Sequence, residues 1–237
     1  MTSATCPTDS ALWKLLSQHP MVSQLEPGDT FTFDSTGGWK RQVSEGDEIA
    51  EVYGLVELID NNPMICADHV SVPSPASTLS LIALGPISQA GLIQGEVVIH
   101  INVLPTETEF LEALATIGCG SQLTVGVDEV DLEGVYACSA IIPVSDQMKL
   151  DDFIDIYREV YDRTFYIRYA SEWHVKEVLN RPWAAYSLNL GEGNEGETLL
   201  TVRVMADKNG KCGAAQMVHA FNVMAGFEES AGIPETI

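Results

Sequence analysis

The apolar segment Ser77–Leu84 is the feature that most constrains the fold of this chain, together with the run EVVIHIN at residues 96–102 that follows it. The first segment has helical character, and Gly85-Pro86 is expected to kink or end that helix. The second segment is typical of a buried strand. We therefore expect a helix here that leads into a sheet.

Further helix and strand patterns follow in mixed order. Thr106 and Glu109 form a Thr-x-x-Glu capping box, which predicts the start of a helix, and apolar residues follow at helical spacing. Helices are also predicted at residues 9–19, 150–161 and 214–224, strands at 31–33, 122–127, 134–144 and 164–169, a turn at 35–38, and a hairpin with its loop at 191–197. This order indicates an α+β fold, with a mixed β-sheet and packed helices.

Charge limits the partners of the chain. Its 34 Asp and Glu residues outnumber its 12 Lys and Arg residues, for a net charge of −22. Such a surface repels nucleic-acid phosphates and anionic membranes, so we expect neither as a partner. It would steer a cationic partner such as a basic peptide, although a merely solvated acidic surface is the alternative interpretation.

Four carboxylates crowd one short stretch of the chain, at Asp128, Glu129, Asp131 and Glu133. In an extended chain positions 129, 131 and 133 share a face, which makes a surface for a basic ligand possible. The DxDxDG pattern of a calcium loop is missing. Protection of an edge strand against pairing with other chains is the alternative role for these charges.

Several common motifs do not occur. The five cysteines are scattered without CxxC spacing, which indicates neither a disulfide framework nor a zinc site. No GxGxxG, GxxxxGK[ST], HExxH or GxSxG motif is present. There is no signal-peptide pattern and no apolar run long enough to span a bilayer, so we expect a cytoplasmic protein.

The C-terminal third carries a specific resemblance. The segments DKNGKCGAAQ (residues 207–216) and NVMAGFEESAGI (residues 222–233) resemble two segments of N-acetyl-γ-glutamyl-phosphate reductase in order and spacing. Upstream, FDSTGGWK (residues 33–40), YGLVEL (residues 53–58) and the apolar helix ending at Ile93 are similar to further segments of that family.

The resemblance implies the α+β domain that forms the C-terminal, dimerising half of semialdehyde dehydrogenases, here at residues 30–237. Residues 1–29 are then expected to form an N-terminal helical arm, too short for the nucleotide-binding domain of that family. No cofactor is therefore expected, and NADPH should not bind.

The sequence differs from the family at positions where the family has catalytic and substrate-binding residues. Pro75 stands where the family has its nucleophilic cysteine, and His100 fits the position of the general-base histidine only with a shift. Glu133 stands in the position of an arginine that helps to hold the acidic substrate. We therefore expect a pseudoenzyme without metal, cofactor or catalytic residues.

Truncated reductases of this kind are similar to accessory proteins of ribosomal peptide pathways such as crocagin biosynthesis. The resemblance implies a homodimer that binds a precursor peptide and that a pathway enzyme could contact. The expected binding residues are Asp128, Glu129, Asp131, Glu133, Ser74 and His100. One alternative is a non-catalytic subunit of a full-length reductase, and another is a small residual enzyme that uses His100 with Ser74 or Ser77.

Overall fold

The computed structural model describes residues 1–35, 37–193 and 196–237. The strands are β1 (Thr2–Cys6), β2 (Val22–Pro27), β3 (Phe31–Asp34), β4 (Lys40–Glu45), β5 (Val52–Tyr53), β6 (His69–Val72), β7 (Val97–Ile101), β8 (Leu123–Val127), β9 (Val135–Val144), β10 (Ile167–Tyr169), β11 (Ala184–Glu192) and β12 (Thr198–Asp207). The helices are α1 (Ala11–Ser17), η1 (Val56–Leu58, a 3-10 turn), α2 (Asn61–Cys66), α3 (Pro75–Gln89), α4 (Glu107–Thr116), α5 (Leu150–Tyr161), α6 (Val175–Val178) and α7 (Ala214–Ala225).

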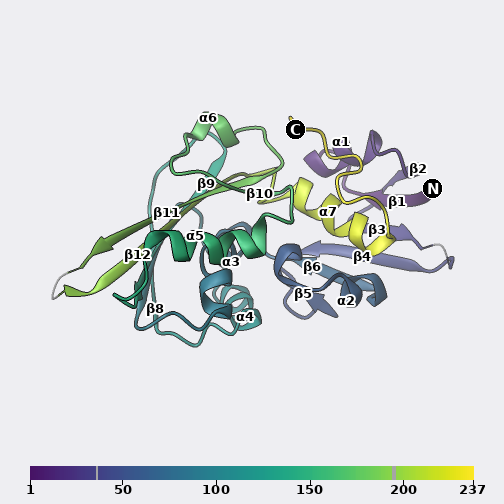
Figure 1. The fold of residues 1–237 in the computed structure, drawn as a ribbon. Helices are drawn as coiled ribbons and strands as arrows, with labels where there is room; N and C mark the ends of the chain where they lie inside the picture. The colour runs from purple at the N-terminus through teal and green to yellow at the C-terminus, as the bar shows by residue number, and fades with distance from the viewer. Residues whose placement is uncertain (36, 194–195) are drawn as a thin grey trace.

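These elements form two mixed sheets, which confirms the predicted mixture of helices and β-structure (Figure 1). The predicted turn at 35–38 contains residue 36, and the predicted hairpin loop at 191–197 contains residues 194–195, so both lie partly outside the described residues. The strands that flank this loop, β11 and β12, pair antiparallel as a hairpin requires.

The first sheet has the strand order β2-β1-β3-β4-β6-β5. Here the structure corrects the prediction of a helical arm at residues 1–29. The helix at 11–17 is present, with the Ser10 hydroxyl accepting from the Trp13 N–H at 3.1 Å, but it connects two parallel strands, β1 and β2. Because β1 also pairs with β3, the first 29 residues belong to the same sheet as the residues that follow.

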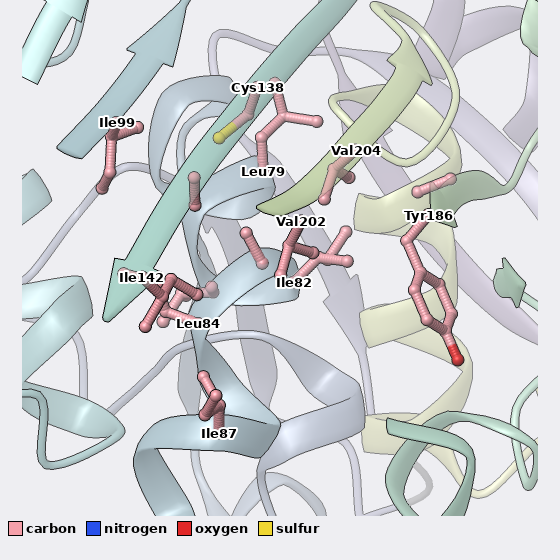
Figure 2. Close-up of a cluster of buried hydrophobic side chains, with 14 of the residues drawn as sticks. Leu79, Ile82, Leu84, Ile87, Ile99, Cys138, Ile142, Tyr186, Val202 and Val204 are labelled. Carbon is pink, nitrogen blue, oxygen red and sulfur yellow. The ribbon is translucent and has the colours of Figure 1, made fainter. Parts of the chain in front are cut away.

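The second sheet has the strand order β10-β11-β12-β9-β7-β8. Helices α3, α4 and α5 cover one of its faces. Figure 2 shows the resulting core, in which Leu84 of α3 lies near Ile142 of β9 and Ile82 of α3 lies near Val202 of β12. The predicted helices at 106–117 and 150–161 and the strands at 122–127 and 134–144 are confirmed to within a few residues.

Of the kink or end that the sequence predicted at Gly85-Pro86, the end is wrong, because helix α3 continues to Gln89. Pro86 has no N–H for the Ile82 carbonyl, four residues earlier. The Tyr161 hydroxyl of α5 donates to that carbonyl instead, at 3.1 Å, and the neighbouring Tyr157 hydroxyl donates to the carbonyl of Ala83. A tertiary contact thus satisfies the acceptor that the proline leaves free.

Helix α7 returns from the second sheet to complete the core of the first (Figure 1). It packs against α1 and α2, and it ends at Gly226, whose φ of 68° suits glycine. The buried Arg41 guanidinium donates to main-chain oxygens at the ends of two helices, those of Met64 and Met224 among them. Arg41 therefore connects β4 to the C-terminal parts of α2 and α7.

Candidate functional site

A cleft of about 560 Å³ opens where the end of β4 meets the loop before α7. Its walls are largely apolar and include Phe31 and Val43 from the first sheet and Met217 from α7. Its charged side chains are those of Asp29, Glu45 and Lys208. An apolar hollow with a few converging polar groups, at the junction of two sheets, is the usual setting of a ligand site.

Glu45 is the most perturbed acid of the cleft. Its side chain is open to the cavity, yet the surrounding walls remove much of its water. This desolvation, together with the negative charge of Glu109, raises the pKa of the Glu45 carboxyl to about 7. Carboxyl groups with a raised pKa in a cleft are frequent in functional sites.

The start of α3 borders this cleft, at the position that the resemblance assigns to the nucleophile. Pro75 is the first residue of the helix, and the buried Glu109 carboxylate occupies the helix end. It accepts hydrogen bonds from the Ser74 N–H at 3.0 Å, from the Ser74 and Ser77 hydroxyls at 2.7 Å each, and from the Tyr53 hydroxyl. These four donors are therefore already engaged by a residue of the chain itself.

The predicted capping box at the start of α4 does not form, because Glu109 points to α3. Thr106 is the N-cap residue of α4 but makes no side-chain capping bond. A carboxylate gains more from several buried donors than from one helix-end N–H exposed to water.

A thiol lies beside Pro75. The Cys212 Sγ is 4.0 Å from the Pro75 carbonyl oxygen, and the residue is only 2% exposed. Burial, with a smaller contribution from Glu45, raises the pKa of this thiol well above its ordinary value. At neutral pH Cys212 is therefore held as the thiol and not as the nucleophilic thiolate.

The predicted acidic surface lines a second hollow of about 440 Å³, next to the cleft. Asp128, Glu129 and Asp131 contribute to it, and Tyr136 and Lys208 line both hollows. Asn102 holds this loop in place: its amide donates to the carbonyls of Val130 and Val135, at 3.1 and 3.2 Å, and its oxygen accepts from the Ala137 N–H at 2.7 Å.

The other predicted site residues fall into separate places. His100 lies beside Asp128, with 3.5 Å between Nδ1 and Oδ1, and both side chains are about half exposed. Glu133 has a left-handed backbone, with φ of 56°, and donates its N–H to Asp131, so it does not share a face with the hollow. Ser74 belongs to the Glu109 cluster. Sequence reasoning missed Glu45, Tyr136 and Lys208 altogether.

Two segments quoted for the resemblance meet in a buried ion pair. Lys211 donates to both Glu57 carboxylate oxygens at 2.7 Å, and both side chains are at most 2% exposed. His219 lies 3.8 Å from Glu57 through Nδ1 and 3.0 Å from Glu229 through Nε2. Burial alone would raise the pKa of Glu57, but the charges of Lys211 and His219 outweigh it and hold that pKa below its usual value.

In the described part of the chain, no group of three or more His, Cys, Asp or Glu side chains is arranged to hold a metal ion. No described helix has both the length and the apolar character needed to cross a membrane.

Comparison with known proteins identifies the fold. No protein-family profile and no curated protein sequence matches the chain. Two solved structures of aspartate semialdehyde dehydrogenase II from Vibrio cholerae do match, one of them complexed with ASA. They align with TM-scores of 0.64 and 0.63 at 9% and 10% identity, over 94% of this chain and 98% of theirs. The chain has the semialdehyde dehydrogenase fold.

At this identity the likeness concerns the fold alone. The closer resemblance to N-acetyl-γ-glutamyl-phosphate reductase stays a prediction from sequence. The alignment does not show the truncation that this resemblance implies, since it runs through nearly all of the dehydrogenase chains. What the structure shows in the N-terminal part of this semialdehyde dehydrogenase fold is a six-stranded sheet with two strand-helix-strand units, β1-α1-β2 and β5-α2-β6.

Proposed function

We propose that this protein is a non-catalytic binding protein for a peptide with basic residues, the precursor peptide of a ribosomal natural-product pathway. The observation that carries this proposal is the acidic hollow of Asp128, Glu129 and Asp131, joined through Tyr136 and Lys208 to the apolar cleft. A peptide that lies across both would bury an apolar side chain in one and place a cation in the other.

The edge of the second sheet supports the same proposal. Strand β8 is the last in its sheet, and it leads directly into the acidic loop at Asp128. Val125 and Val127 are 37% and 43% exposed. An extended peptide could pair with this edge through its main chain while its basic side chains reach the acidic loop.

The arrangement at the start of α3 supports the absence of reductase activity. Pro75 offers no nucleophile, Glu109 fills the helix end, and Cys212 is held as a thiol. The turn between β1 and α1 is Pro7-Thr8-Asp9-Ser10, without the glycines that let a main chain approach a pyrophosphate. We therefore expect no NADPH binding.

The binding proposal is tested by calorimetry with a synthetic octapeptide of alternating lysine and valine. Saturable one-to-one binding is expected, together with no response to NADPH. A counterpart with glutamate in place of lysine should bind much more weakly. Equal binding of the two peptides, or micromolar affinity for NADPH, would contradict the proposal.

Neutralising the acidic hollow should weaken peptide binding. The double variant Glu129→Gln with Asp131→Asn removes two charges, and the asparagine can still accept the Glu133 N–H. We expect about a tenfold loss of affinity for the lysine–valine peptide at low salt, and a smaller loss at high salt. The matched control is Glu133→Gln with Glu192→Gln, two exposed positions that do not line the hollow. A loss of equal size in the control would show that net charge alone acts.

The open face of the second sheet favours a second candidate, a regulatory or structural subunit of a full-length reductase. The helices α3, α4 and α5 cover one face of this sheet. On the other face, the side chains of Val98, Ile141 and Leu199 are only partly buried. The same face could pair two copies of this chain, and we propose a homodimer for the protein by itself. Sedimentation of the protein alone, and then mixed with a full-length reductase, separates a homodimer from a mixed assembly.

A further inference from the structure

The Glu45 carboxylate has no partner. No hydrogen bond or ion pair within the described ranges involves this side chain. The cation of the cleft, Lys208, instead extends along the main chain of Gly134, with its Nζ 3.8 Å from where a Cβ would stand. The Glu45 side chain at the end of β4 is exposed, and no cation of the described residues pairs with it.

The walls next to Glu45 are apolar. Phe31 and Val43 come from the neighbouring strands β3 and β4, while Leu12 of α1 and Met217 of α7 complete the hollow. An aliphatic chain of several methylene groups could lie along these walls and bury apolar surface there. Apolar side chains beside a carboxylate that no cation of the described residues pairs match a long side chain with a cationic end, and Asp29 adds a second carboxylate to the lining.

We propose that the cleft binds an alkyl cation, an ammonium or guanidinium group at the end of an aliphatic chain, with the cation on Glu45 and the chain against the half-buried side chains of Ala11 and Met217. This inference rests on the proposed peptide binding and deepens it. A lysine or arginine of the peptide would be the residue that anchors it in the cleft. A free alkyl amine offers the same chemistry.

The titration of Glu45 gives this site a distinct signature. The groups that face it from the surrounding elements are Glu109, Tyr136, Cys212, Lys208 and Asp29. With a pKa of about 7, the carboxyl is largely protonated at slightly acidic pH in the free protein. A bound cation favours the carboxylate, so binding releases a proton below that pH and becomes weaker as the pH falls.

The first arm of the test is calorimetry with n-pentylammonium and n-pentylguanidinium, and with n-pentanol as the uncharged control. We expect saturable binding of both cations, about tenfold or more weaker for Glu45→Gln. The matched control Glu192→Gln makes the same change in net charge at the far end of β11 and should behave as the unmodified protein. In two buffers of different ionisation enthalpy near pH 6, close to one proton should be released, and none by Glu45→Gln.

The second arm uses the lysine–valine octapeptide and a counterpart with norleucine for lysine, against both variants. The alkyl-cation site is overturned if Glu45→Gln, verified as folded by circular dichroism, binds the pentyl cations and the peptide as tightly as Glu192→Gln. If the pentyl cations require Glu45 but the octapeptide does not bind, the site stands and the proposed peptide function fails. If the octapeptide binds without regard to Glu45, the proposed function stands and this inference fails.

Discussion

Lys211→Met is expected to destabilise the protein by about 3–5 kcal/mol at neutral pH, because it leaves the buried Glu57 carboxylate without its cation. Lys211 supplies hydrogen bonds to both oxygens of that carboxylate, and water does not reach the pair. The His219 ring is 3.8 Å away and does not replace those bonds. Urea unfolding followed by circular dichroism measures the loss. Lys208→Met, which removes an exposed cation three residues earlier, should change stability by less than about 0.5 kcal/mol.

Two further measurements separate the loss of charge pairing from the loss of packing. The double variant Glu57→Leu with Lys211→Met should recover much of the stability, because no unpaired charge then remains in the core. In Lys211→Met, burial should raise the pKa of Glu57, so the deficit should shrink as the pH falls and the carboxyl is protonated. A deficit that persists in the double variant and at every pH would show that the shape of Lys211, and not its charge, matters.

Glu109→Gln is expected to cost about 2–3 kcal/mol, although the side chain keeps its size. Every group that contacts the Glu109 carboxylate is a donor: the Ser74 N–H and the hydroxyls of Ser74, Ser77 and Tyr53. A glutamine would turn an NH₂ group toward some of these donors and leave them unsatisfied in the core. Thermal and urea unfolding measure the effect. Glu112→Gln, exposed on the same helix, is the control, and similar stabilities of the two variants would contradict this account.

The Glu109 cluster also bears on function. Its carboxylate lies at the start of α3, where it accepts from Ser74 and Ser77. If Glu109→Gln stays folded, its altered helix end still lacks a nucleophile at Pro75, so no reductase activity should appear.

Local patterns were sufficient for most of the secondary structure. The helix at 150–161 and the strand at 134–144 have strong periodicity, and both were confirmed. In β1 the buried side chains are small or polar, namely those of Thr2, Ala4 and Cys6. Such a segment becomes a strand through its pairing with β2 and β3, which local propensity does not reveal. That is why a helical arm was predicted for residues 1–29.

Some residues of the candidate site could be predicted from the sequence and others could not. The carboxylates at 128, 129 and 131 could be found because they are neighbours in sequence, although the turn at Glu133 removes that residue from their hollow. Glu45, Tyr136 and Lys208 come from three distant segments and carry no motif, so only the packing of the two sheets brings them to one cleft.

By itself the sequence determined the mixture of helices and strands, the acidic composition and the proline at residue 75. These properties depend on residue type and short-range spacing. The tertiary structure alone decided that the first residues enter a sheet, that Glu109 turns from its own helix to α3, and that Glu45 remains unpaired. Each of these outcomes depends on which distant donors, acceptors and charges the fold brings within a few ångströms, because burial makes such contacts decisive for buried polar groups.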